Sequence, residues 1–157
     1  MHMRARGNTF RGLSMASAIV LLMAASAAAG FDLKQIQAEP NLERRSKLAL
    51  DNAAAVLQTA REAYRNGETE KVALLVAEVH DSVALAFASL QQTNKDPRRS
   101  PKWFKYAEVA TRDLLRKIDS FQQEMSFTER PVLDKVKEKT QQVHDDLLVG
   151  LMEGKKK

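Results

Sequence analysis

The sequence predicts an all-α protein, an antiparallel up-down-up-down four-helix bundle that follows an N-terminal signal peptide. After residue 30, Pro and Gly are rare and divide the chain into four segments of about 24 residues each. These segments are rich in strong helix formers, and their apolar residues recur at alternating spacings of three and four. Matched lengths and short connections favour such a bundle. A pair of helical-repeat hairpins is less favoured, because tetratricopeptide helices are about half as long.

The N-terminal residues 1–29 have the layout of a secretory signal peptide. Three arginines lie within the first eleven residues, an apolar run covers residues 13–25, and small residues follow it. Cleavage after Ala27 or after Ala29 fits this pattern, and an uncleaved N-terminal anchor is the alternative. We therefore expect an exported protein, periplasmic or extracellular and soluble after cleavage. Residues 30–40 are expected to form a flexible segment before the bundle.

Composition argues against several functional classes. The chain has no cysteine, which excludes disulfides, a cysteine nucleophile and covalent haem attachment. It has no Gly-rich phosphate loop and no Glu-x-x-His pair for a di-iron centre, so we expect no cofactor and no enzyme. The chain has 25 Lys and Arg against 20 Asp and Glu. The signal segment holds three arginines and no acid, so the mature chain has 22 against 20. This small excess gives no reason to expect nucleic acid as a partner.

The predicted bundle spans residues 41–152 and begins with a helix over residues 41–65. Asn41 is a favoured N-cap, and Gly67 is placed to end the helix in the left-handed conformation. The second helix covers residues 69–92, where apolar side chains form a seam without the alternation by two that marks a strand. The seam residues are Val72, Val76, Val79, Val83, Ala86 and Leu90.

The third and fourth helices follow the longest internal loop, residues 93–100. Ser100 as N-cap and Pro101 as first helical residue start a helix that ends near Met125. The fourth helix is expected over residues 129–152. Ser126 with Glu129 would form a capping box, but Thr128 is the preferred N-cap because it places Pro131 within the first turn. Residues 153–157 form a basic C-terminal tail.

Charge is expected to be concentrated at one end of this bundle. The end that collects the starts of helices one and three holds eleven Lys and Arg against four acids, whereas the other holds five against seven. Helix N-termini carry partial positive charge and bind anions. We therefore predict a non-enzymatic binding or scaffolding role through this end, for an anionic cell-envelope component or an acidic protein partner. The predicted anion-binding residues are Arg98, Arg99, Lys102, Lys105, Arg44 and Arg45.

Two histidines support an alternative function. His80 and His144 each follow a seam valine and precede an acid, Asp81 or Asp145. If helices two and four are parallel and diagonal in the bundle, the histidines lie at similar heights, and the four side chains offer ligands for a divalent metal in a periplasmic metal-binding protein. A periplasmic chaperone is a third hypothesis. The Ala-rich seam of the first helix also leaves a homodimer open.

Overall fold

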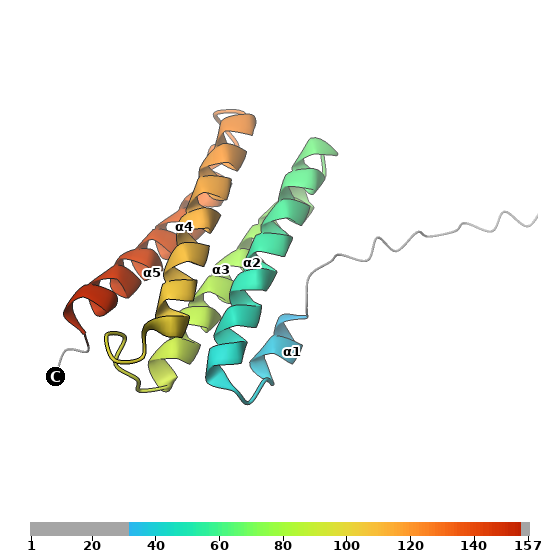
Figure 1. The fold of residues 1–157 in the computed structure, drawn as a ribbon. Coiled ribbons are helices and arrows are strands. Elements are labelled where there is room, and N and C mark those ends of the chain that lie inside the picture. The colour runs from blue at the N-terminus through green and yellow to red at the C-terminus, as the bar shows by residue number, and fades with distance from the viewer. Residues whose placement is uncertain (1–31, 155–157) are drawn as a thin grey trace, which may run out of the picture.

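The computed structural model describes residues 32–154, and this part of the chain folds into helices without a strand (Figure 1). Four long helices pack against one another, which confirms the predicted all-α four-helix bundle. Chain direction alternates from each long helix to the next (Figure 1). The elements are α1 (Leu33–Gln37), α2 (Leu42–Arg65), α3 (Thr69–Gln92), α4 (Pro101–Glu124), a 3-10 turn η1 (Arg130–Leu133) and α5 (Asp134–Glu153).

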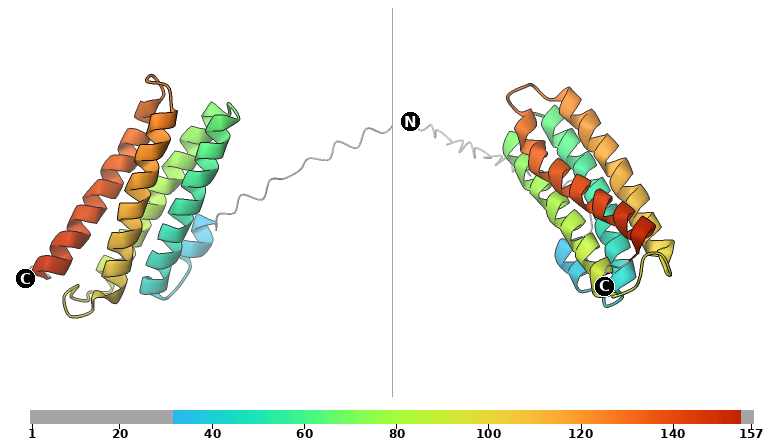
Figure 2. Two further views of the ribbon diagram at one scale, coloured as in Figure 1. Left: turned by 45° about the horizontal axis from the view of Figure 1, so that its top comes forward. Right: turned by 90° about the vertical axis from the view of Figure 1, so that its left-hand side faces the viewer.

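The order of neighbours around the bundle differs from the prediction. The hairpins α2–α3 and α4–α5 lie side by side, so that α2 packs against α4 and α3 against α5 (Figure 2). The expectation that the second and fourth helices are diagonal was therefore wrong. The diagonal pairs are α2 with α5 and α3 with α4. The physical reason is the connection over residues 93–100, which is long enough to carry the chain across this end of the bundle.

The ends of α2 follow the sequence signals. Asn41 is its N-cap, and its side-chain oxygen accepts a 2.8 Å hydrogen bond from the N–H of Arg44. Gly67 has φ +77°, and its N–H donates to the carbonyl of Tyr64 at 2.9 Å. Left-handed backbone of this kind favours glycine because a Cβ would be strained there. The turn returns the chain directly into α3.

The core lies between the two hairpins, where all six predicted seam residues of α3 are buried. Small side chains, including Ala49, Ala53, Ser82 and Ala86, bring α2 and α3 close together. Their interface also buries Asn52, whose amide nitrogen donates to Glu78 and Ser82.

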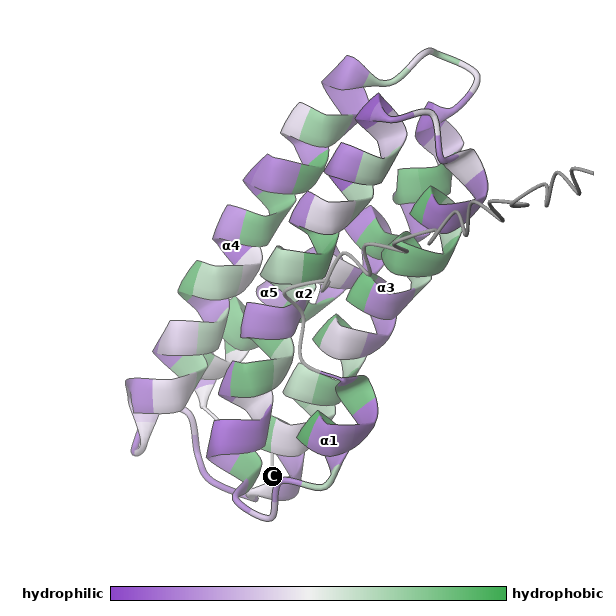
Figure 3. Cartoon of the chain, turned by 90° about the vertical axis from the view of Figure 1, so that its right-hand side faces the viewer, coloured by the Kyte–Doolittle hydropathy of each residue, from purple (hydrophilic) through white to green (hydrophobic). Residues whose placement is uncertain are grey.

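Helix α3 is long and apolar enough, by length and composition alone, to cross a membrane. Part of this apolar character comes from the seam that α3 buries in the core, which includes Val72, Val79 and Val83. Figure 3 shows hydrophobic and hydrophilic residues on the same helices.

The connection into α5 departs from the prediction. The α-helix begins at Asp134, after the η1 turn, instead of near Glu129. Pro131 lacks an N–H and cannot join an α-helical ladder, so the chain first makes one 3-10 turn. Ser126 and Glu129 do contact each other, with the Ser126 hydroxyl donating to the Glu129 carboxylate. Thr128 is not the N-cap.

Within the segment 30–40 that was expected to be flexible, the described residues include the short helix α1 beside α2 and α3 (Figure 3). Asp32 caps it by accepting a hydrogen bond from the N–H of Lys34. Ile36 is only 2% exposed, so burial of this side chain holds the segment on the bundle. The predicted signal peptide lies outside the described residues, as do residues 155–157 of the basic tail.

Candidate functional site

The predicted anion-binding residues come together at one end of the bundle. Because α2 and α4 run in the same direction and lie side by side, their starts share this end with the ends of α3 and α5 (Figure 1). The residues brought to this end are Arg98, Arg99, Lys102, Lys105, Arg44 and Arg45.

The segment just before α4 forms a capped turn of its own. The Asp96 side chain accepts a 2.8 Å hydrogen bond from the N–H of Arg98. The backbone carbonyl of Asp96 accepts a 2.9 Å hydrogen bond from the N–H of Ser100. Pro97 follows the cap, which is a favoured position for proline. Arg98 and Arg99 therefore lie on a separate turn and not in the first turn of α4.

The start of α4 has no side-chain cap. Ser100 occupies the N-cap position, but its side chain makes no capping hydrogen bond, and the first turn contains no acid. The first N–H groups of a helix have no partner within the helix, and together they carry a partial positive charge. Lys102 and Lys105 add full positive charges beside them.

Arg98 has a structural position at the end of α5. A Cβ added to Gly154 would lie 3.0 Å from Cδ of Arg98, so the two residues are packed together. Helix C-termini carry partial negative charge and favour a nearby cation. One turn earlier, a Cβ on Gly150 would lie 3.2 Å from Cγ of Pro97. Close approach at both glycines fixes the 93–100 loop against α5.

The two arginines of α2 are also engaged. Nε of Arg44 lies 3.3 Å from the carboxylate of Glu39, and Nε of Arg45 donates to the Glu39 carbonyl at 2.8 Å. Within residues 32–154, no acid lies within ion-pair distance of Arg99, Lys102 or Lys105. All three are exposed. Other described cations also form no ion pair, such as Lys117 and Lys135, but these three lie together around the start of α4.

Aromatic side chains extend this basic end along the α2–α4 interface. The rings of Trp103 and Tyr106 meet edge to face with centroids 6.3 Å apart. Lys102 Nζ lies 5.0 Å from the centre of the Trp103 ring, and Lys47 Nζ lies 5.4 Å from that of Tyr106. The Tyr106 hydroxyl donates a 2.6 Å hydrogen bond to Asp51. Cations and aromatic rings therefore alternate across the two helices.

Asp51 raises the pKa of both side chains that it contacts, Tyr106 and Lys47. Burial raises the pKa of Tyr106 above its ordinary value, and the hydrogen bond to Asp51 raises it further. The pKa of Lys47 is also raised, chiefly by its 2.5 Å hydrogen bond to Asp51. Both shifts favour the protonated groups that hold α4 on α2. Sequence reasoning missed this contact because Asp51 and Tyr106 are far apart in the chain and no motif links them.

The predicted metal ligands are divided between different places. His144 is buried, with Nδ1 3.3 Å from the hydroxyl oxygen of Thr111 on α4. The same ring nitrogen lies 3.9 Å from the Glu108 carboxylate, so the His144 ring faces α4. His80 instead pairs with Asp81 at 3.1 Å and lines a groove between α3 and the start of α5. Among residues 32–154, no group of three or more His, Asp or Glu side chains could hold a metal ion.

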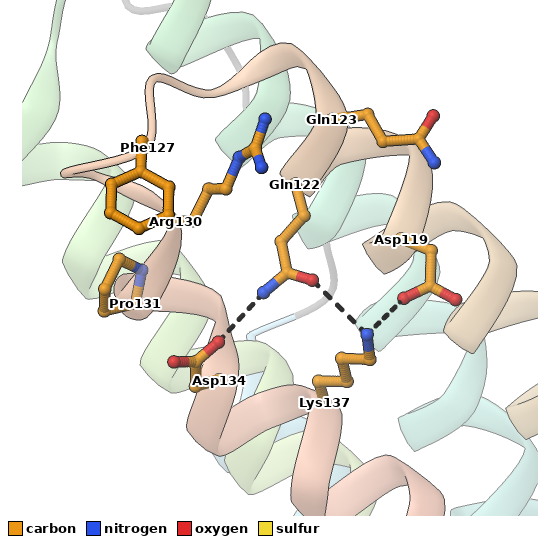
Figure 4. Close-up of a pocket in the computed structure, with 8 residues that line it drawn as sticks. All are labelled: Asp119, Gln122, Gln123, Phe127, Arg130, Pro131, Asp134 and Lys137. Atoms are coloured by element: carbon orange, nitrogen blue, oxygen red, sulfur yellow. Dashed lines mark hydrogen bonds and ion pairs between the residues drawn. The ribbon is translucent and has the colours of Figure 1, made fainter.

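A second groove, of about 630 Å³, lies at the other end of the bundle (Figure 4). Its polar side chains largely satisfy one another. Gln122 donates to Asp134 at 2.9 Å, and Lys137 forms a 2.7 Å ion pair with Asp119 and a 3.4 Å hydrogen bond with Gln122 (Figure 4). Arg130 forms no ion pair, and its Nε donates instead to the Met125 carbonyl at 3.2 Å.

Comparison with known proteins adds no relative to these observations: no protein-family model matches the chain, and no curated protein or solved structure is significantly similar to it.

Proposed function

We propose that this chain is a non-enzymatic, exported binding protein that binds an anionic component of the cell envelope through the start of α4. The observation that carries the proposal is the uncapped helix start beside the unpaired cations Arg99, Lys102 and Lys105. An acidic protein partner would use the same charges.

The physical argument rests on what this end lacks. Cations near a helix N-terminus destabilise the helix by about 0.3–1 kcal/mol each when exposed, and no acid in the first turn of α4 offsets them. A bound phosphate or carboxylate group would accept hydrogen bonds from the free N–H groups and pair with the lysines. Binding would therefore relieve the repulsion.

The other two hypotheses have less support. A metal-binding function would require His80, Asp81, His144 and Asp145 to converge, yet the two histidines contact different neighbours. A chaperone function would be favoured by a broad apolar surface, whereas the exposed large apolar side chains of the described residues are few.

Chromatography on phosphocellulose tests the proposal with two variants of equal net charge. The first replaces Arg99, Lys102 and Lys105 with Gln. The matched control replaces three lysines that lie away from this end, Lys117, Lys135 and Lys139.

We expect the first variant to elute at clearly lower salt than the control, because only the first loses the local cluster. Equal elution of both variants would show that retention follows total charge, and would overturn the proposal. Circular dichroism establishes that each variant keeps its helix content.

A further inference from the structure

Exposed apolar side chains gather on the same part of the molecule as the unpaired cations. Of the six exposed large hydrophobic residues among residues 32–154, four lie within the first three turns of α4 or the last two turns of α5. They are Val109, Leu148, Val149 and Met152, and Met152 is 76% exposed. The remaining two, Leu74 and Phe127, are 74% and 85% exposed and lie singly at the opposite end.

The packing of the 93–100 loop on α5 keeps these two kinds of side chain together. Gly154 lies against Arg98, and Gly150 lies against Pro97. The end of α5, with Val149 and Met152, is therefore fixed beside the turn that leads into Lys102 and Lys105. A combined basic and apolar surface results, which we define by Arg99, Lys102, Lys105, Val149 and Met152.

This combination favours a lipid surface over other anions. A free phosphate or an acidic glycan would satisfy the cations but would bury no apolar side chain. A bilayer with anionic headgroups provides both contacts. The cations of this surface pair with the headgroups, and its apolar side chains enter the boundary of the acyl chains. Trp103 follows Lys102 directly in the chain, and its ring type suits the interface between water and lipid. The exposed acids Asp145, Asp146 and Glu153 lie on the same turns of α5, so the attraction to anionic headgroups comes from the cations at the start of α4.

We propose that this combined surface docks the protein on the face of an anionic lipid bilayer, without spanning it. The inference rests on the proposed function, since the cations are shared, and it adds the apolar contact and the identity of the partner.

The chain has one tryptophan, Trp103, which can report on docking. The processed protein is recovered from an exporting host, and its N-terminus is determined by mass spectrometry. It is then mixed with vesicles of phosphatidylglycerol and phosphatidylcholine, or of phosphatidylcholine alone. We expect Trp103 fluorescence to shift to the blue with the anionic vesicles only, and co-sedimentation to weaken as salt is added.

Two further variants separate lipid docking from simple charge attraction. Val149→Gln with Met152→Gln removes apolar contact at the proposed surface, and Leu74→Gln with Phe127→Gln is the matched control. We expect the first pair to bind anionic vesicles about tenfold more weakly than the wild type, through lost apolar burial. The control pair should bind as the wild type does.

The outcomes distinguish the two proposals. Retention on phosphocellulose that depends on Arg99, Lys102 and Lys105, without vesicle binding, would overturn lipid docking and leave the proposed function standing. Equal vesicle binding by wild type and the Val149, Met152 variant would show adsorption by charge alone, and would also overturn this inference. If retention on phosphocellulose does not depend on the three cations and no vesicle binding is seen, both proposals are wrong.

Discussion

The hydroxyl of Tyr64 lies 2.9 Å from the carboxylate of Glu129 and joins α2 to the connection between α4 and α5. The same hydroxyl oxygen accepts a 3.1 Å hydrogen bond from the N–H of Ser126. The Tyr64 ring packs edge to face on Phe121, with centroids 5.8 Å apart. One side chain therefore links the two hairpins at the end opposite the basic end.

Replacement of Tyr64 by Phe should lower stability at neutral pH and change its dependence on acid. Hydrogen bonds from Ser126 and then Tyr64 lower the pKa of Glu129 below its ordinary value of 4.5. A lowered carboxyl pKa stabilises the folded state above the unfolded pKa, and this contribution is lost as pH falls through the folded pKa. We expect the melting temperature to fall by a few degrees at neutral pH. The difference from wild type should narrow below about pH 4.5. A difference that stays constant with pH would contradict a role for Glu129.

Replacement of Tyr106 by Phe tests the bond to Asp51 on the α2–α4 interface. Loss of one hydrogen bond to a charged group should lower the free energy of unfolding by about 1.5–3 kcal/mol, measured by urea denaturation. The pKa of Tyr106 is raised in the folded state, so its contribution is full below the unfolded pKa and is lost as pH rises through the folded pKa. The difference between variant and wild type should therefore shrink in alkaline solution above about pH 10. A difference that persists there would show that the effect does not depend on the protonated hydroxyl and its bond to Asp51.

Local signals explain why much of the fold could be predicted from sequence. Asn41, Gly67 and Pro101 each act through their own backbone or the next turn, and the structure places them as expected. The seam spacing likewise gave the buried face of α3. What the spacing could not determine is which helices are neighbours, because the same inward faces can be paired around the bundle in more than one order. The diagonal prediction for His80 and His144 failed for this reason.

The candidate site was predictable in its position but not in its internal pairing. Charge counted along the chain placed Lys102 and Lys105 at the end where α2 begins. It could not show that Arg98 packs on Gly154 at the end of α5. Such pairing depends on contacts between segments distant in sequence, which periodicity does not encode.

Addition of zinc or copper should leave the melting temperature unchanged. A metal that binds only the folded state raises it, and His80 and His144 are engaged with Asp81 and Thr111 respectively. Melting is followed by circular dichroism with and without metal, for wild type and for His80→Ala. A rise in the wild type that His80→Ala removes would revive the metal-binding hypothesis.

Replacement of Gly154 by Ala should destabilise the bundle more than replacement of Gly67 by Ala. Both glycines have positive φ, +79° and +77°, so each substitution introduces backbone strain of about 1 kcal/mol or more. At Gly67 a Cβ meets nothing within 4 Å, whereas at Gly154 it would lie 3.0 Å from Cδ of Arg98 and 3.3 Å from the carboxylate of Asp96. The additional steric conflict should push the 93–100 loop away from α5. Urea denaturation measures both variants, and Arg98→Ala in the Gly154→Ala background should restore part of the difference. If the two glycine variants lose equal stability and Arg98→Ala restores none, the loop is not held by this contact.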